Sequence, residues 1–151
     1  MTQETFQDEA KRLRPTLTAV AERYSDNAAD AEDIVQDVLL KLWLMHDDLR
    51  SPADGLAIMM TRNLSIDHQR RRKPQRPTLD IPEEEHEEDE RIDRMMQLID
   101  TLPPMQQIIL RFRHLDGMEY SEIAHITSST ETAVRKMISR ARKEILLKLK
   151  K

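Results

Sequence analysis

The sequence predicts an all-α protein made of two small helical domains joined by a flexible acidic linker. Only two of the 151 residues are glycine, and helix-favouring Ala, Leu, Met, Glu, Lys and Arg are abundant, whereas β-branched and aromatic residues are sparse. Apolar residues recur at helical spacing on both sides of a proline-rich, acidic stretch near the middle. We therefore expect an N-terminal domain over residues 1–73, a linker over 74–89 and a C-terminal domain over 90–151.

The linker is predicted from composition and charge. The segment KPQRPTLDIPEEEHEED, residues 73–89, contains three of the seven prolines and almost no apolar residue, so it cannot bury enough surface to fold alone. Basic blocks lie before it and in the last helix, which the formal net charge of -4 conceals. Because phosphate binding depends on fields within a Debye length of about 8 Å, the acidic total does not exclude a nucleic-acid partner.

Three helices are expected in the N-terminal domain. The first spans residues 6–24, and Pro15 inside it is expected to break or kink the helix. The second spans residues 28–49, with a wide apolar face and acids in its first turns. The third starts near Ser51 with Pro52 at its first position, and ends in the basic run HQRRRK.

The C-terminal domain is predicted to end in a helix-turn-helix, winged-helix-like unit. A helix over residues 91–100 comes first, and a second starts near Pro103 and Pro104 and stops at Asp116-Gly117. In YSEIAHITSSTETAVRKMISRAR, residues 120–142, Ser121 is expected to cap one helix and Thr130 the next. The last helix should bury one stripe and expose a basic face; the stripe is Val134, Met137, Ile138, Ala141, Ile145 and Leu149.

A basic helix face has two readings. It is often only a solvated surface, but two short helices joined by about four residues, with the second one basic, match the geometry that seats a recognition helix in the major groove. Outward arginines there can reach guanine edges or phosphate oxygens. The helix-turn-helix pattern favours the second reading, a DNA-binding helix.

Several other functions find no support in the sequence. No segment approaches the roughly 18 apolar residues of a membrane span, and the first residues lack the apolar run of a secretory signal, so a cytoplasmic protein is expected. Cysteine is absent, which excludes disulfides and thiolate metal sites. No phosphate-binding glycine loop, metalloprotease motif or nucleophile constellation occurs. We expect no enzyme, no cofactor, no metal site, no small-molecule substrate and no membrane insertion.

Two separate segments resemble one family, the extracytoplasmic-function (ECF) sigma factors of the bacterial sigma-70 family. The first comprises DAEDIVQDVLLKLW and TRNLSIDHQRRRK, and the second is LPPMQQIILRFRHLDGMEYSEIAHITSSTETAVRKMISRARKEI. The resemblance implies an alternative sigma factor that binds core RNA polymerase, directs it to specific promoters and promotes transcription initiation. It also implies promoter DNA and an anti-sigma factor as partners, and association with the nucleoid through the polymerase.

The resemblance further implies three sets of functional residues. Core polymerase binding falls on Glu32, Asp33, Gln36, Asp37, Leu39 and Trp43. Minus-ten DNA binding falls on Arg62, Asn63, Asp67, Arg70, Arg71, Arg72 and Lys73. Minus-thirty-five DNA binding falls on Thr130, Thr132, Arg135, Lys136, Ser139, Arg140 and Arg142. From the residues alone, the acids are equally well explained as ordinary helix-start residues, and Asn63 and Asp67 as bonds within the bundle.

The chain departs from the family at three positions. Many relatives carry one aromatic residue where Leu56 stands and another near Ile58, so stacking on minus-ten bases would have to come from elsewhere, or methionine side chains would have to line the base pocket. Ser128 replaces a glycine of the helix-turn-helix turn, where a left-handed conformation costs serine energy.

Two other functions remain open at this point. One is a stand-alone helix-turn-helix regulator that binds duplex DNA as a dimer without polymerase. The other is a helical adaptor whose basic faces bind acidic protein partners.

Overall fold

A computed structural model of the chain describes residues 1–72 and 83–150, except the side chains of 71, 72, 83–89 and 92. All regular secondary structure in these ranges is helical, which confirms the predicted fold class. No helix among the described residues is long and apolar enough to cross a membrane.

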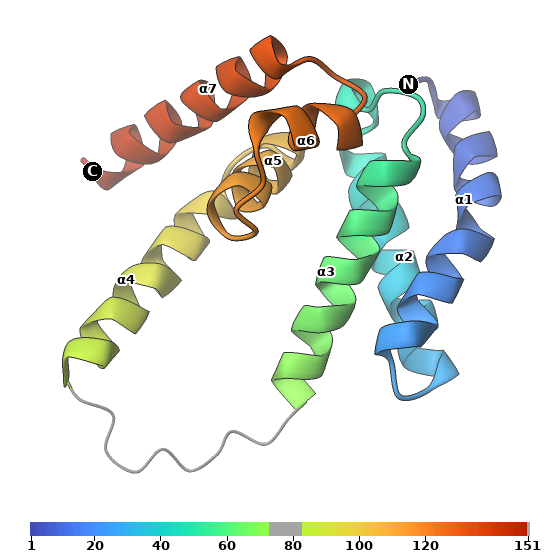
Figure 1. Cartoon of the computed structure of the whole chain (residues 1–151), viewed down its shortest axis with the longest axis horizontal. Coiled ribbons are helices and arrows are strands. Elements are labelled where there is room, and N and C mark those ends of the chain that lie inside the picture. Colours follow the sequence, from blue (N-terminus) through green and yellow to red (C-terminus); the bar gives the residue numbers. More distant parts are fainter. Residues whose placement is uncertain (73–82, 151) are drawn as a thin grey trace.

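The N-terminal domain is a three-helix unit (Figure 1). Its helices are α1 (Gln3–Tyr24), α2 (Ala28–Leu44) and α3 (Asp54–Arg72), with a 3-10 turn (His46–Asp48) after α2. α1 packs on both other helices, and α2 packs on α3. The apolar stripes of the three helices meet in one core, whose most enclosed side chains are Leu17, Val35, Val38, Leu42 and Leu56.

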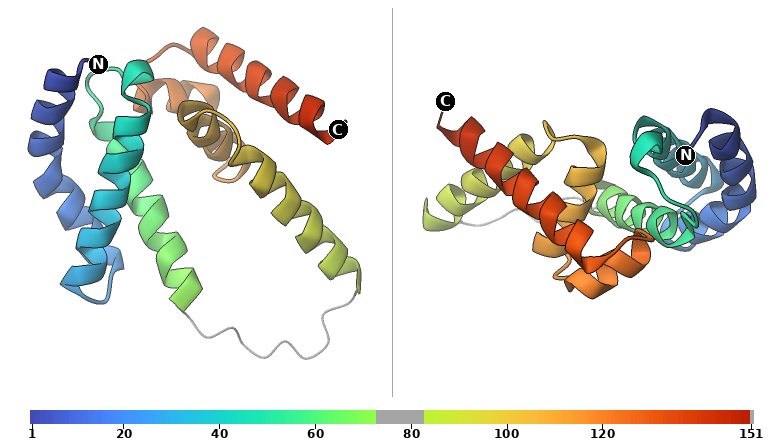
Figure 2. Two further views of the ribbon diagram at one scale, coloured as in Figure 1. Left: turned by 180° about the vertical axis from the view of Figure 1, so that it is seen from behind. Right: turned by 90° about the horizontal axis from the view of Figure 1, so that it is seen from above.

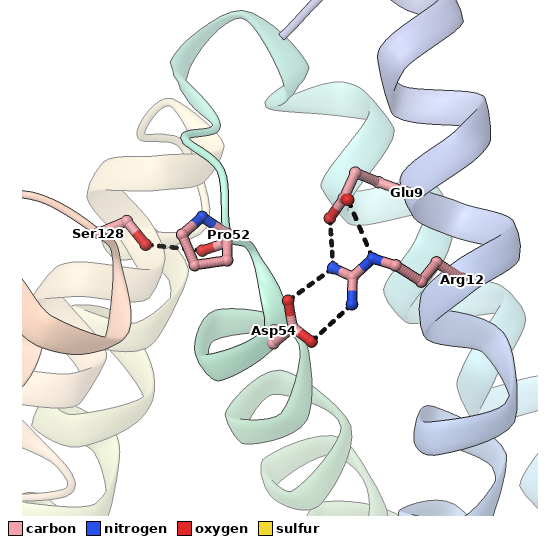
Figure 3. Close-up of polar contacts among 5 residues, drawn as sticks. All are labelled: Glu9, Arg12, Pro52, Asp54 and Ser128. Atoms are coloured by element: carbon pink, nitrogen blue, oxygen red, sulfur yellow. Dashed lines mark hydrogen bonds and ion pairs between the residues drawn. The ribbon is translucent and has the colours of Figure 1, made fainter.

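Three predicted features of this domain are wrong. α1 runs through Pro15 to Tyr24, so the expected break is wrong, and the alternative of a kink stays a prediction. α2 ends at Leu44 because the chain tightens into the 3-10 turn. α3 begins at Asp54, two residues after Pro52, and its first turn is held by Arg12, which donates to Asp54 at 2.6 and 2.9 Å and to Glu9 (Figure 3). The guanidinium hydrogen bonds lower the pKa of Asp54.

The C-terminal domain contains four helices, seen from two further sides in Figure 2. They are α4 (Glu83–Ile99), α5 (Pro104–His114), α6 (Tyr120–Ile126) and α7 (Glu131–Leu149). α4 starts eight residues before the predicted helix, so the end of the acidic tract is helical; glutamates favour helices and suit the positive end of the helix dipole. The rest of the predicted linker, residues 74–82, lies outside the described residues.

The turns of the helix-turn-helix follow the sequence closely, with two corrections. Thr130 caps α7, since its hydroxyl oxygen accepts from the Ala133 amide at 3.1 Å. Ser128 adopts the left-handed conformation, with φ 54°. However, Glu119 rather than Ser121 occupies the cap position of α6, and Leu149 is 54% exposed because α7 extends past its packing partners.

The two domains touch along α3 and α6. A Cβ on Gly55 would lie 3.2 Å from the carbonyl oxygen of Ile126, a tight contact that would require a small shift of the backbone, so glycine favours the close approach of the two helices. Beside this contact the Ser128 hydroxyl donates to the carbonyl oxygen of Pro52 at 2.6 Å (Figure 3). Neither contact was predicted, because each joins segments far apart in the sequence.

Candidate functional site

The acidic residues predicted for polymerase binding lie together on the outer face of α2. Glu32, Asp33, Gln36 and Asp37 are exposed, while the opposite side of the helix enters the core through Ile34, Val35 and Val38. This separation follows from the helical period, which puts positions i, i+1, i+4 and i+5 on one side. Asp33 and Asp37 form no ion pair among the described residues, so the face presents unneutralised carboxylates to solvent.

Trp43 and Leu39, the apolar members of that predicted set, are only partly exposed. The Trp43 ring stacks on His46 with centroids 4.3 Å apart and tilts against Phe6 at 5.3 Å. Trp43 therefore anchors the end of α2 to α1 and to the 3-10 turn.

Two leucines that the sequence reasoning missed extend the α2 surface. Leu40 and Leu44 are 56% and 64% exposed. They lie four residues apart outside the buried stripe, and this spacing was the signal that could have identified them. Together with the carboxylates they give α2 a face that is acidic at its start and apolar at its end.

The minus-ten candidates from Arg62 to Arg72 lie in α3, and those with described side chains differ in exposure. Arg62, Asp67 and Arg70 are exposed. Asn63 is half-buried, and its amide donates to Asp116 of the C-terminal domain at 3.2 Å. Asn63 and Asp67 also line a groove of about 240 Å³ between the two domains.

The remaining minus-ten candidates are not placed. Arg71 and Arg72 belong to the last turn of α3, but their side chains are not described, and Lys73 lies outside the described residues. Leu56, which stands at an aromatic position of the family, is 1% exposed and part of the core. A base cannot stack on it in this fold.

The minus-thirty-five candidates lie on the outer face of α7, apart from Thr130, which is the N-cap residue of that helix. All seven are exposed: Thr130, Thr132, Arg135, Lys136, Ser139, Arg140 and Arg142. Val134, Ile138 and Ala141, each at most 1% exposed, hold the opposite face against the domain. The structure thus brings this predicted set together on one surface of a helix that follows a tight turn.

Side chains from neighbouring helices support that basic face. Arg142 donates to the ring nitrogen Nε2 of His114 at 3.2 Å, which requires a neutral acceptor at that atom. Burial, followed by the positive charges of Arg142 and Arg113, lowers the pKa of His114. The guanidinium groups of Arg113 and Arg135 both lie over the Tyr120 ring.

Each domain presents one charged helix face. Within the described ranges, no group of three or more His, Cys, Asp or Glu side chains could hold a metal ion. One domain presents an acidic helix face, and the other presents a basic helix face in a helix-turn-helix.

Two family models match the chain, one in each domain. The model described as "Sigma-70 region 2" matches residues 10–75, and the one described as "Sigma-70, region 4" matches residues 92–145. Together they cover most of the chain, and they leave residues 76–91 between them unmatched.

Curated relatives are similar over most of this chain. The probable RNA polymerase sigma factor RfaY of Xanthomonas campestris pv. campestris is 29% identical over 84% of the chain and 36% of its own length. The ferric citrate uptake sigma factor FecI of Escherichia coli is 27% identical over 83% of this chain and 79% of its own length. The ECF RNA polymerase sigma factor SigJ of Mycobacterium tuberculosis is 29% identical over 91% of this chain and 49% of its own length. The chain thus spans half or less of two of these relatives.

Solved structures with a similar course of the chain include two complexes. The sigma factor RpoE, crystallised with the anti-sigma factor NepR from Bartonella quintana, is 21% identical over 97% of this chain and 98% of that chain, with a TM-score of 0.43. CnrH, solved with the cytosolic domain of CnrY, is 20% identical over 99% of this chain and 90% of the CnrH chain, with a TM-score of 0.43.

Proposed function

Because the chain belongs to the sigma-70 family of RNA polymerase sigma factors, we propose that it is an alternative sigma factor of the ECF type. In this proposal it binds core RNA polymerase, directs it to specific promoters and promotes transcription initiation. The observation that carries the proposal is the presence of region 2 and region 4 in one chain, each in its own helical domain. A stand-alone helix-turn-helix regulator has no need for the first of these domains.

The proposed polymerase contact is the outer face of α2. Its free carboxylates at Asp33 and Asp37 suit a basic partner surface, where charge complementarity sets orientation and encounter rate. The exposed Leu40 and Leu44 supply apolar area beside them. Acids that served only the helix dipole would be confined to its first turn, whereas Asp37 lies well beyond it.

The proposed promoter contacts are the second half of α3 for the minus-ten element and the outer face of α7 for the minus-thirty-five element. Exposed Arg62 and Arg70 provide positive charge on α3, and five basic side chains do so on α7. Phosphate contacts from such residues position a protein on DNA, and bidentate arginine contacts to guanine read sequence.

Further partners follow from the same proposal. Members of this family are commonly held inactive by an anti-sigma factor, which we include among the partners of this chain. Catalysis belongs to the polymerase, and the chain itself is not proposed to be an enzyme. Its place is the cytoplasm, at the nucleoid, through its association with polymerase.

In vitro transcription tests the proposal directly. Purified chain and core RNA polymerase are incubated with genomic templates, and transcript 5′ ends are mapped with and without the chain. We expect defined start sites that depend on the chain. DNA binding without promoter-specific transcripts, or failure to form a holoenzyme, would favour the stand-alone regulator.

A charge-reversal pair tests the polymerase contact. The Asp33→Lys/Asp37→Lys variant should bind core polymerase at least about tenfold more weakly, since like charges would then face each other. Asp8→Lys/Glu22→Lys on α1 makes the same charge change at exposed positions and should bind normally. Equal affinity of both double variants would defeat the assignment to α2.

A further inference from the structure

Two arginines from different helices meet the ring of Tyr120. The guanidinium carbon of Arg113, on α5, lies 4.3 Å from the ring centroid, and that of Arg135, on α7, lies 4.7 Å from it. Both distances are well within the roughly 6 Å at which a cation is attracted by an aromatic face. Tyr120 is the first residue of α6, so the ring connects all three helices of the helix-turn-helix region.

The two arginines are held differently. Arg113 is half-buried and also donates from Nη1 to the carbonyl oxygen of Met118 at 3.0 Å. Arg135 is exposed and makes no hydrogen bond or ion pair with any described residue. Among the described residues, its guanidinium group is therefore held by the contact with the Tyr120 ring. All five N–H donors of Arg135 remain available to an external acceptor.

This arrangement suits an anionic ligand. No carboxylate pairs with Arg113 or Arg135 in the part of the chain that the structure describes, so two like charges share one ring without neutralisation. A free arginine on a helix surface loses rotamer freedom when it binds, and a ring that already holds the guanidinium reduces that loss.

We propose that Tyr120 is a positioning residue that holds the Arg135 guanidinium in place for the minus-thirty-five element. The inference rests on the proposed function and adds a residue that has no assigned part in it. The face of the ring carries the effect, because the Tyr120 hydroxyl forms no hydrogen bond with a described residue. Phenylalanine should therefore substitute for tyrosine, whereas leucine should not.

Tyr120 is also half-buried against the core of the domain, so the test has to separate positioning from packing. A double-mutant cycle does this. Holoenzymes carrying the wild-type chain, Tyr120→Phe, Tyr120→Leu, Arg135→Ala or Tyr120→Leu/Arg135→Ala are compared for affinity to a promoter fragment mapped by transcription. Urea unfolding of each chain is measured in parallel.

We expect Tyr120→Phe to bind as the wild type does and Tyr120→Leu to bind about two- to fivefold more weakly, the size of an exposed cation–π contact. In the Arg135→Ala background, Tyr120→Leu should cause no further loss. Three results would overturn the proposal: wild-type affinity for Tyr120→Leu, the same loss in both backgrounds, or an equal loss for Tyr120→Phe. A wild-type holoenzyme that fails at every template would instead defeat the proposed function.

Discussion

Helices α3 and α7 are of equal length, 19 residues each, and both carry predicted DNA-binding residues. They differ in how far their neighbours in the fold enclose them. α3 packs against α1 and α2 and also meets α6 of the other domain. α7 packs through one stripe and leaves its basic side open to solvent along several turns. A helix enclosed on several sides offers only a few residues to a ligand, whereas a peripheral helix offers a whole face.

The difference bears on how the two promoter elements can be reached. In this arrangement the minus-thirty-five candidates are all exposed, while Asn63 is bonded to Asp116 across the domain contact. For Asn63 to reach minus-ten DNA, that bond has to break. In the free chain, the proposed DNA-binding surface on α7 is thus more accessible than the one on α3.

The largest expected effect concerns the enclosed part of α3. Leu56→Ala should lower the free energy of unfolding by about 2–5 kcal/mol, because it removes a fully buried side chain and leaves a cavity. Leu40→Ala, at a 56% exposed site of the same domain, is the control and should change it by less than about 0.5 kcal/mol. Denaturation followed by the fluorescence of Trp43, the single tryptophan, measures both. If Leu56→Ala kept its stability but lost recognition of the minus-ten element, Leu56 would instead be a DNA-contacting residue.

The next effect concerns the open face of α7. If Arg140 makes a bidentate guanine contact, Arg140→Ala should cost about 1–3 kcal/mol of promoter affinity and relax preference at one base pair. Lys150→Ala, at the exposed end of the chain, serves as the comparison. Affinities to a set of minus-thirty-five variants measure the change. Uniform weakening across that set, with a salt slope reduced by about one, would identify a phosphate contact instead.

A smaller effect is expected at the domain contact. Asp116→Ala/Ser128→Ala removes the hydrogen-bond partners of Asn63 and of the Pro52 carbonyl, each worth about 0.5–1.5 kcal/mol at most. The free chain should then populate larger distances between the domains. Because the protein has no cysteine, labels at Asp8→Cys and Lys143→Cys report that distance by fluorescence energy transfer. An unchanged distance distribution would show that these bonds do not hold the domains together.

The smallest effect is a pH dependence at His114. Its pKa is lowered in the folded chain by burial and by Arg142 and Arg113, so the unfolded chain takes up a proton first as the pH falls. Stability should therefore be complete above the unfolded value of about 6.5 and decrease as the pH drops through it. His114→Asn should weaken this decrease in urea titrations between about pH 7.5 and 5.5. If the stability of the wild type and of His114→Asn decreased in parallel with falling pH, the pH dependence would not come from His114.

Local patterns in the sequence predicted much of this structure. The 3.6-residue period correctly placed Val134, Ile138 and Ala141 in the core and the basic residues outside, because α7 is buried on one side. The Thr130 cap also followed from residue chemistry, whereas Ser128 adopts the left-handed conformation despite its cost to serine. The family resemblance is confirmed by the region 2 and region 4 matches.

Features that depend on tertiary contacts could not be predicted. α3 begins after Pro52, and its first turn is hydrogen-bonded to Arg12, a residue 42 positions away. The bond from Asn63 to Asp116 and the Tyr120 cluster likewise join separate elements. The polymerase-binding and DNA-binding roles of all the candidate residues, and the boundaries of the domains and linker, remain predictions.

Promoter spacing tests most directly whether one chain reads two elements. Inserting five base pairs between the mapped minus-ten and minus-thirty-five elements moves them about 17 Å apart and turns one by half a helical turn. If α3 and α7 bind both elements at once on the same polymerase, transcription from this template should fall at least about tenfold, while a substitution of five base pairs without insertion should leave it unchanged. Full transcription from the same start site after the insertion would contradict the two-surface function.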